Sequence, residues 1–274
     1  MSRSGLVTQA VARRSASKLL KNPGPGLPPL LIPLFMFAAV AGAMSSIDIG
    51  YYNYTAFTFV FVVYMGAMFV GVFTGIEIAG DFGTGIGARL MLAAPRRLAI
   101  IGGYLVTSFV RGLIAVVVIG GIAVATGMPI RGGVLDILGL VALALLLNVA
   151  TTLYGAGVAL RVQSAGGGVL IFIPVFMFML LTPAFVPRNL LSGWLNTAAD
   201  INPLTPAMEA GRNFMANTSA NLGLAFGATA GLVVVFLLWA ITGMHKAERG
   251  PSGSRRRRRP RRETGPSAPV QPSV

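Results

Sequence analysis

The chain has 274 residues, of which 54% are hydrophobic and 11% are charged, with a formal net charge of +14 and no cysteine. So little polar surface could not cover a folded chain of this length in water, and the composition indicates an integral membrane protein. The lack of cysteine excludes disulfides, thiolate metal sites and cysteine nucleophiles. Seven arginines lie in the stretch RRRRRPRR, residues 255–262. The basicity is therefore local, and it favours a cytoplasmic tail near anionic lipid heads over a nucleic-acid-binding protein.

The N-terminal stretch MSRSGLVTQAVARRSASKLLKN is basic and precedes a long apolar run. We predict that residues 1–26 form a cytoplasmic amphipathic segment at the membrane interface, which leads into the first span. The alternative is a cleaved signal peptide. We favour the amphipathic segment, because the apolar run continues with bulky residues and offers no acceptable cleavage site.

Six stretches are apolar and long enough to cross a hydrocarbon core, which requires roughly 20 residues. Each is bounded by glycine, proline or charge, and none alternates with the period of two expected of a membrane β-barrel. The sequence therefore predicts an all-α polytopic membrane protein with six transmembrane helices. The predicted spans are residues 27–44, 56–79, 105–128, 134–160, 168–186 and 222–244.

The lysines and arginines outside these spans predict the orientation. With the N-terminus inside, eighteen of them lie on the cytoplasmic side, and three lie outside: Arg131, Arg188 and Arg212. This bias follows the positive-inside rule, and an even number of spans returns the chain to its starting side. We expect cytoplasmic N- and C-termini, with residues 245–274 forming a basic, disordered tail.

The predicted cytoplasmic loop, residues 80–97, contains the sequence GTGIGARLMLAAPRR after Asp81 and Phe82. The glycines do not form a phosphate-binding loop, because no preceding strand and no Gly-Lys-Ser or Gly-Lys-Thr ending accompanies them. We interpret them as turn residues before a short helix that ends at Pro95. Asp81 is expected to cap that helix. The helix is either an ordinary amphipathic turn or a docking element for a soluble partner.

Two ionisable residues fall at the cytoplasmic ends of spans, Glu77 and Arg111. Such groups are costly in the bilayer, so we predict that Glu77 pairs with Arg111, or that Arg111 snorkels to the headgroups. A structural bracket between the two helices is favoured over a contact with substrate. For Asn148, Thr151 and Thr152 in the fourth predicted span, helix packing is likewise favoured over substrate binding.

Residues 187–217 are too polar to span and too apolar for a free loop. Because Asn202-Pro203 interrupts the pattern, we predict two short helices in an extracellular hairpin that partly re-enters the outer leaflet. Trp194 is expected at the membrane interface. Glu209 and Arg212, three residues apart, are expected to form a surface ion pair.

Two other classes of membrane protein would require features of their own. An intramembrane enzyme would require a nucleophile with a base, or a metal cluster, whereas the chain has one histidine, His245, and its eight acids lack metal-ligand spacing. A secondary transporter or channel remains the alternative. It would be expected to show matched broken helices or a line of buried charges, and neither is evident.

Three stretches resemble the permease subunits of type-2 ABC exporters, the group that includes the daunorubicin-resistance permeases. They are DFGTGIGARLMLAAPRR at 81–97, TPAFVPRNLLSGWLNTAADINPLTPAMEAGR at 182–212, and KNPGPGLPPLLIPLFMF at 21–37. The second predicted span lacks the proline-glycine pair found in many members. The resemblance implies that the loop docks on an ATPase subunit through Arg89, Leu90, Met91, Pro95, Arg96 and Arg97. It also implies an extracellular gate in the hairpin, formed by Phe185, Pro187, Trp194, Asn202, Pro203, Glu209 and Arg212.

The resemblance further implies a function for the whole chain. It would be one permease of a homodimer or heterodimer in a bacterial cytoplasmic membrane, moving a hydrophobic or amphipathic compound such as a drug or lipid outward. This chain would hold no cofactor and no ATPase site, since a separate nucleotide-binding subunit would bind ATP and Mg. The expected partners are that subunit, a second permease, membrane lipids and the substrate, with no nucleic acid.

Overall fold

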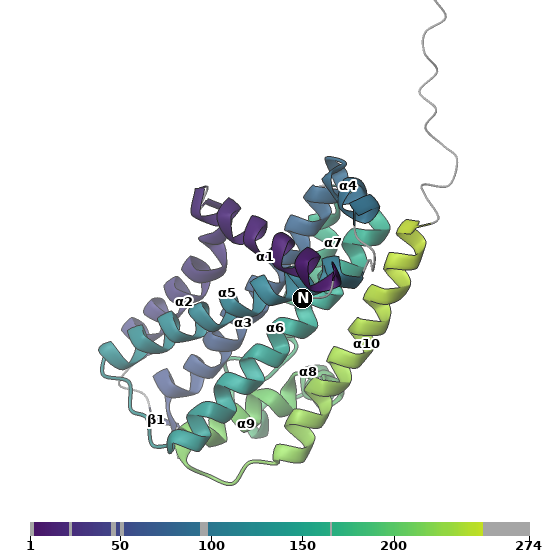
Figure 1. The fold of residues 1–274 in the computed structure, drawn as a ribbon. Helices are drawn as coiled ribbons and strands as arrows, with labels where there is room; N and C mark the ends of the chain where they lie inside the picture. The colour runs from purple at the N-terminus through teal and green to yellow at the C-terminus, as the bar shows by residue number, and fades with distance from the viewer. Residues whose placement is uncertain are drawn as a thin grey trace, which may run out of the picture.

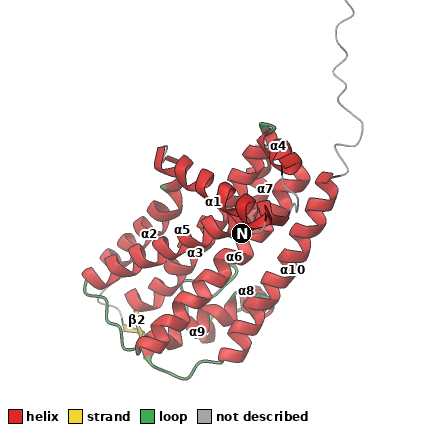
Figure 2. Cartoon of the chain, in the orientation of Figure 1, coloured by secondary structure: helices red, strands yellow, loops and turns green. Residues whose placement is uncertain are grey.

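A computed structural model of the protein describes residues 3–21, 24–44, 48–49, 52–93, 98–164 and 166–248. These residues are almost entirely helical (Figure 2), as the apolar composition predicts. The long helices are α1 (Arg3–Lys21), α2 (Pro28–Met44), α3 (Tyr54–Gly83), α5 (Leu98–Ala125), α6 (Val134–Val162), α7 (Gly167–Leu180) and α10 (Leu222–Glu248). The shorter elements are α4 (Ile86–Ala93), α8 (Trp194–Ile201), α9 (Thr205–Ala216), the 3-10 turns η1 (Gly24–Gly26) and η2 (Arg188–Leu190), and the strands β1 (Asp48–Ile49) and β2 (Tyr52–Asn53).

Four of these helices, α3, α5, α6 and α10, are long and apolar enough to cross a membrane. The other two predicted spans correspond to shorter helices, α2 and α7. Helix α7 ends at Leu180, although the sequence predicted a span to residue 186. The chain turns here because Pro183 has no N–H group to continue the helical hydrogen bonds. At the other end of the chain, α10 extends into the predicted tail as far as Glu248.

Helix α3 is the central helix of the bundle. In the most apolar 18 residues of α3, 94% of the residues are buried within the protein. The corresponding share is 17% to 39% for α5, α6 and α10. Helices α2, α5, α6 and α7 pack around it. Its sequence is apolar on all sides, which is the pattern of a helix surrounded by other helices.

Helices α3 and α6 cross closely at two glycines of α3, Gly71 and Gly75. A methyl group on Gly75 would lie 2.6 Å from the Cα atom of Gly155, and one on Gly71 would lie 2.7 Å from the Asn148 carbonyl oxygen. Both distances are far shorter than a van der Waals contact, and both involve backbone atoms. Small residues at this crossing therefore allow the two backbones to meet, as they commonly do between membrane helices.

Polar side chains join three helices near this crossing. The buried Asn148 amide donates hydrogen bonds to the Ala67 carbonyl of α3 at 2.9 Å and to Ser108 Oγ of α5 at 3.2 Å. Thr152 bonds Ser108 at 2.7 Å, and Thr151 donates to the Met68 carbonyl at 3.2 Å. These contacts between helices are those that the packing interpretation predicts.

The two ends of the bundle differ. Helix α4 and the C-terminal end of α10 lie at one end, and α8, α9 and the small β1–β2 ribbon lie at the opposite end (Figure 1). We call these the α4 end and the α8–α9 end. Most of the candidate functional residues fall at these two ends.

Candidate functional site

A tight turn joins α3 to α4. Gly85 adopts a φ of 82°, which a residue with a side chain rarely adopts, and Gly87 lies directly against the Phe82 ring. The glycines therefore act as turn residues, as the sequence predicted. Because the turn is so short, α4 is held directly against the end of the central helix.

Helix α4 presents two different faces. Leu90 and Met91 are half-buried and pack against the hydrophobic core of the protein. Leu92 is 88% exposed, and Arg89, one turn before it, is also exposed. Leu90 and Met91, which the resemblance assigns to docking, therefore lie against the bundle, and the helical repeat turns Leu92 outward. Docking through Leu90 and Met91 stays a prediction. Pro95, Arg96 and Arg97 lie outside the described residues.

Asp81 does not cap α4. It belongs to the last turn of α3, where its side chain is buried and accepts two hydrogen bonds from Arg14 of α1, each 2.9 Å long. Tyr104 of α5 donates a third at 2.6 Å, and the Lys18 ammonium lies 3.4 Å away. This hydrogen bonding raises the pKa of Arg14 above its ordinary value. A carboxylate with three partners from other elements is not free to bind the amides of the next helix.

The predicted contact between Glu77 and Arg111 is present. Arg111 Nη1 of α5 lies 3.0 Å from Glu77 Oε2 of α3, and both side chains are largely buried. Arg111 Nη2 also donates to the Ser15 carbonyl of α1 at 2.8 Å, and Ser15 Oγ donates to Glu77 Oε1 at 2.9 Å. The pair therefore connects three helices rather than the two that were predicted.

Helix α1 follows the first half of α5. Thr8 donates to the Ala99 carbonyl at 3.1 Å, and Thr107 donates to the Ala12 carbonyl at 3.3 Å. Together with Arg111, these contacts fix the register of α1 against α5. We call Arg14, Lys18, Glu77, Asp81 and Arg111 the charge cluster; it joins α1, α3 and α5 close to the turn that leads to α4.

Spacing in the sequence could have revealed the role of α1. Arg14 and Lys18 are four residues apart, as are Glu77 and Asp81, so each pair lies on one face of its helix. Two basic residues and two acidic residues at the same helical spacing, in a chain with only eight acids, indicate two elements that pair with each other. The match is not evident when each helix is considered separately.

We expect Glu77 and Arg111 to be energetically coupled. In a double-mutant cycle of Glu77→Gln, Arg111→Gln and the double variant, the coupling free energy should be about 1–2 kcal/mol, because each single change leaves a largely buried partner unpaired. Thermal unfolding of the detergent-purified protein provides the measurement. If the two single effects simply add, the pair does not brace the helices.

At the α8–α9 end, one arginine binds two acids. Arg188 lies between Asp200 of α8 and Glu209 of α9, in hydrogen-bonding contact with the first and 3.1 Å from the second. Hydrogen bonds to Asp200 and Glu209 raise the pKa of Arg188. All three side chains are at least 37% exposed, so each ion pair contributes about 1 kcal/mol or less to stability.

The predicted surface pair of Glu209 and Arg212 is wrong, because Arg212 is buried. Its Nη2 atom donates to the Pro183 and Ala184 carbonyls at 2.6 and 3.0 Å, and its guanidinium lies 3.5 Å from the centre of the Phe57 ring. Arg212 therefore satisfies two backbone carbonyls of the turn that follows α7. In this way α9 is tied to both α7 and α3.

The remaining hairpin residues occupy definite positions. Asn202 separates α8 from α9, as predicted, and donates to the Phe178 carbonyl of α7 at 2.7 Å, with Pro203 next to it. The Phe185 carbonyl accepts from Tyr54 Oη at 3.0 Å, and the Phe185 ring lies 5.3 Å from that of Phe61. Pro187 precedes η2, and Trp194 begins α8 with 74% of its surface exposed.

Comparisons with known proteins identify the family. Residues 7–216 match the model of the ABC-2 type transporter family. The daunorubicin resistance ABC transporter permease protein DrrB1 of Streptomyces coeruleorubidus is 24% identical over 180 residues, which are 64% of this chain. The match spans 63% of that relative's length. The membrane domain of this family lacks an ATPase site, and its permeases partner with nucleotide-binding subunits. The chain is thus a multi-pass membrane protein that belongs to the ABC-2 type transporter family.

Proposed function

We propose that the chain is the permease subunit of a bacterial ABC exporter that moves a hydrophobic or amphipathic compound outward across the cytoplasmic membrane. The observation that carries this proposal is the position of α4. It exposes Arg89 and Leu92 at one end of the bundle, and a tight glycine turn attaches it to the central helix. A soluble partner bound there could move α3 directly.

The charge cluster supports the same proposal. It joins the end of α3 to α1 and α5 through buried or partly buried contacts of 2.8 to 3.4 Å. A displacement of α4 would therefore reach several helices together instead of bending one. Movement of packed helices against one another is a usual way in which a local event becomes a global rearrangement.

The proposed topology has six spans with both termini cytoplasmic. The excess of basic residues in the segments that include α1, α4 and the C-terminal tail supports this orientation. Helix α7, with 14 residues, extends only about 21 Å. We count it as a span together with the irregular residues 181–186. The Pro183 and Ala184 carbonyls of this segment accept hydrogen bonds from Arg212, which matters because lipid chains offer no donor.

The proposed complex contains two permeases, identical or different, and a nucleotide-binding subunit that holds ATP and Mg. The α8–α9 hairpin would form the extracellular gate, with Trp194 at the membrane interface. Its contacts support a gate that moves as a unit, because Asn202 and Arg212 attach both parts of the hairpin to the end of α7. The relative's drug-resistance name supports an amphipathic compound as substrate.

Co-expression tests the proposal. The chain is purified by an affinity tag together with a candidate ABC ATPase encoded beside it. We expect the ATPase to co-purify in a fixed ratio and its hydrolysis rate to change on binding. If a stable chain binds no such ATPase, and alone accumulates compounds under a proton gradient, it is a secondary transporter instead.

A further inference from the structure

A cavity of about 320 Å³ lies between α1, α2, α3 and α5, beside the charge cluster. This volume falls within the range of small-molecule pockets, about 300–1,000 Å³. Most of its wall is apolar. The apolar lining residues are Pro29, Leu30, Val70, Phe73, Ile76 and Ile114.

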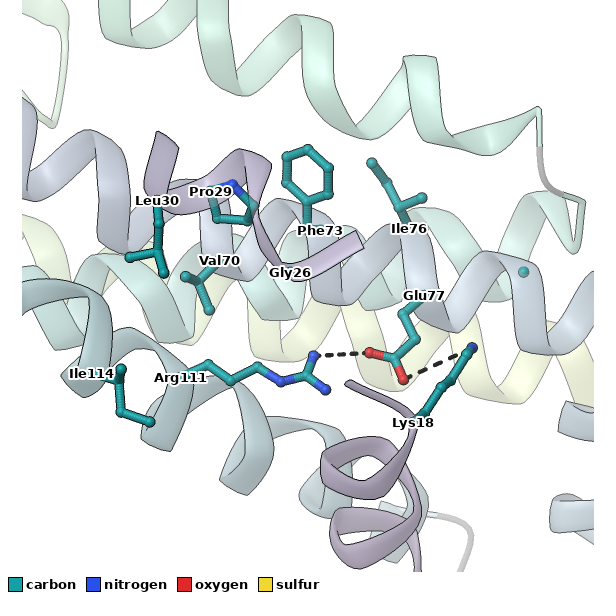
Figure 3. Close-up of a pocket in the computed structure, with 11 residues that line it drawn as sticks. Lys18, Gly26, Pro29, Leu30, Val70, Phe73, Ile76, Glu77, Arg111 and Ile114 are labelled. Atoms are coloured by element: carbon teal, nitrogen blue, oxygen red, sulfur yellow. Dashed lines mark hydrogen bonds and ion pairs between the residues drawn. The ribbon is translucent and has the colours of Figure 1, made fainter. Parts of the chain in front are cut away.

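The charged residues of the cavity are gathered on one side. Lys18, Glu77 and Arg111 lie together, and Leu30, Val70 and Phe73 lie on the opposite side (Figure 3). Two cations and one anion leave an excess of one positive charge. Helix α1, which supplies Lys18, contains five basic residues and no acid. The cavity thus has an apolar part and a positively charged part, which is the pattern that an amphiphile with an anionic head requires.

Donors at the charged side are not all used. No described residue accepts a hydrogen bond from Arg111 Nε, which is buried. The Lys18 ammonium donates one hydrogen bond, to Asp81 at 3.4 Å, and lies 4.0 Å from Glu77; its side chain is 52% exposed. An ammonium has three N–H donors, so Lys18 retains donors for a further acceptor. Arg111 and Lys18 lie on either side of the Glu77 carboxylate (Figure 3). A phosphate oxygen bound at the Lys18 ammonium would therefore leave the pair between Arg111 and Glu77 intact.

The cavity reaches the outer surface of the bundle at Ile114, which is 52% exposed. A membrane lipid can therefore enter it from the side. We propose that the cavity binds an anionic phospholipid, with its phosphate at Lys18 and an acyl chain along Phe73, Val70 and Leu30. Basic pockets between membrane helices commonly bind such headgroups. This site does not depend on the compound that the complete transporter carries.

The cysteine-free chain allows a direct test. A single Ile114→Cys variant carries a fluorophore at the cavity, and a Val117→Cys variant carries it three residues further along α5, where the side chain is 62% exposed but does not line the cavity. Each is reconstituted in phosphatidylcholine vesicles that contain equal fractions of brominated phosphatidylglycerol or brominated phosphatidylcholine. Quenching of the fluorophore reports which lipid is beside it.

We expect brominated phosphatidylglycerol to be enriched at position 114 roughly fivefold over position 117, the equivalent of about 1 kcal/mol. In the labelled Ile114→Cys background, adding Lys18→Gln should remove the enrichment, Lys18→Arg should retain it, and Lys21→Gln should leave it unchanged, since Lys21 is exposed on α1 but does not line the cavity. Equal quenching by both lipids at position 114, or enrichment that survives Lys18→Gln, would overturn the proposal.

Discussion

Leu92→Asp should weaken the association of the ATPase subunit by roughly 10- to 150-fold. Leu92 is 88% exposed on α4, and its burial in a partner would contribute about 1.5–3 kcal/mol. The aspartate removes this contribution and places a charge in the interface. The affinity of the purified chain for the ATPase, measured by titration in detergent, provides the test.

Leu190→Asp is the matched control. Leu190 is 63% exposed but lies in η2, at the opposite end of the bundle. The Leu190→Asp variant should leave the affinity of the chain for the ATPase unchanged. Both variants should retain the unfolding temperature of the original protein. If Leu92→Asp binds the ATPase as tightly as the original protein does, α4 is not the docking element.

The second large effect is expected at the crossing of α3 and α6. Gly75→Ala should lower the free energy of unfolding by about 1–3 kcal/mol, because the new methyl group would lie 2.6 Å from a backbone atom of Gly155 and force the helices apart. Reversible unfolding of the reconstituted or detergent-purified chain provides the measurement.

Gly80→Ala on the same helix provides the comparison. A methyl group at Gly80 would meet no atom within 4 Å, so the substitution should be neutral or slightly stabilising. Equal stability of the two variants would show that the close approach at Gly75 does not hold the bundle together.

Patterns along the chain were sufficient to predict most of the helices. Apolar length located α2, α3, α5, α6, α7 and α10, since backbone hydrogen bonds in lipid leave few alternatives. Asn202-Pro203 located the break between α8 and α9 because proline restricts the residue before it. The end of α7 was missed because residues 181–186 remain apolar after the helix stops. Hydropathy does not distinguish an apolar helix from an apolar turn.

The charged contacts were predicted less well, because the nearest charge in sequence is often not the partner in space. Glu77 and Arg111 were paired correctly, since both fall at the same end of adjacent spans. Asp81 was assigned to the nearby α4, whereas its partners are Arg14 and Tyr104, which are 67 and 23 residues away. Arg212 was assigned to Glu209 by helical spacing, although the carbonyls at the end of α7 compete for it. Which of several possible partners a charged side chain contacts therefore depends on how the helices pack.

ATP-driven transport in vesicles distinguishes an exporter permease from a secondary transporter. The chain is reconstituted with and without its ATPase subunit, and movement of a fluorescent amphipathic compound across the bilayer is followed. We predict transport only when the subunit, ATP and Mg are all present, with loss of transport in the Leu92→Asp variant. Transport by the chain alone, driven by a proton gradient and unaffected by ATP, would identify a secondary transporter instead.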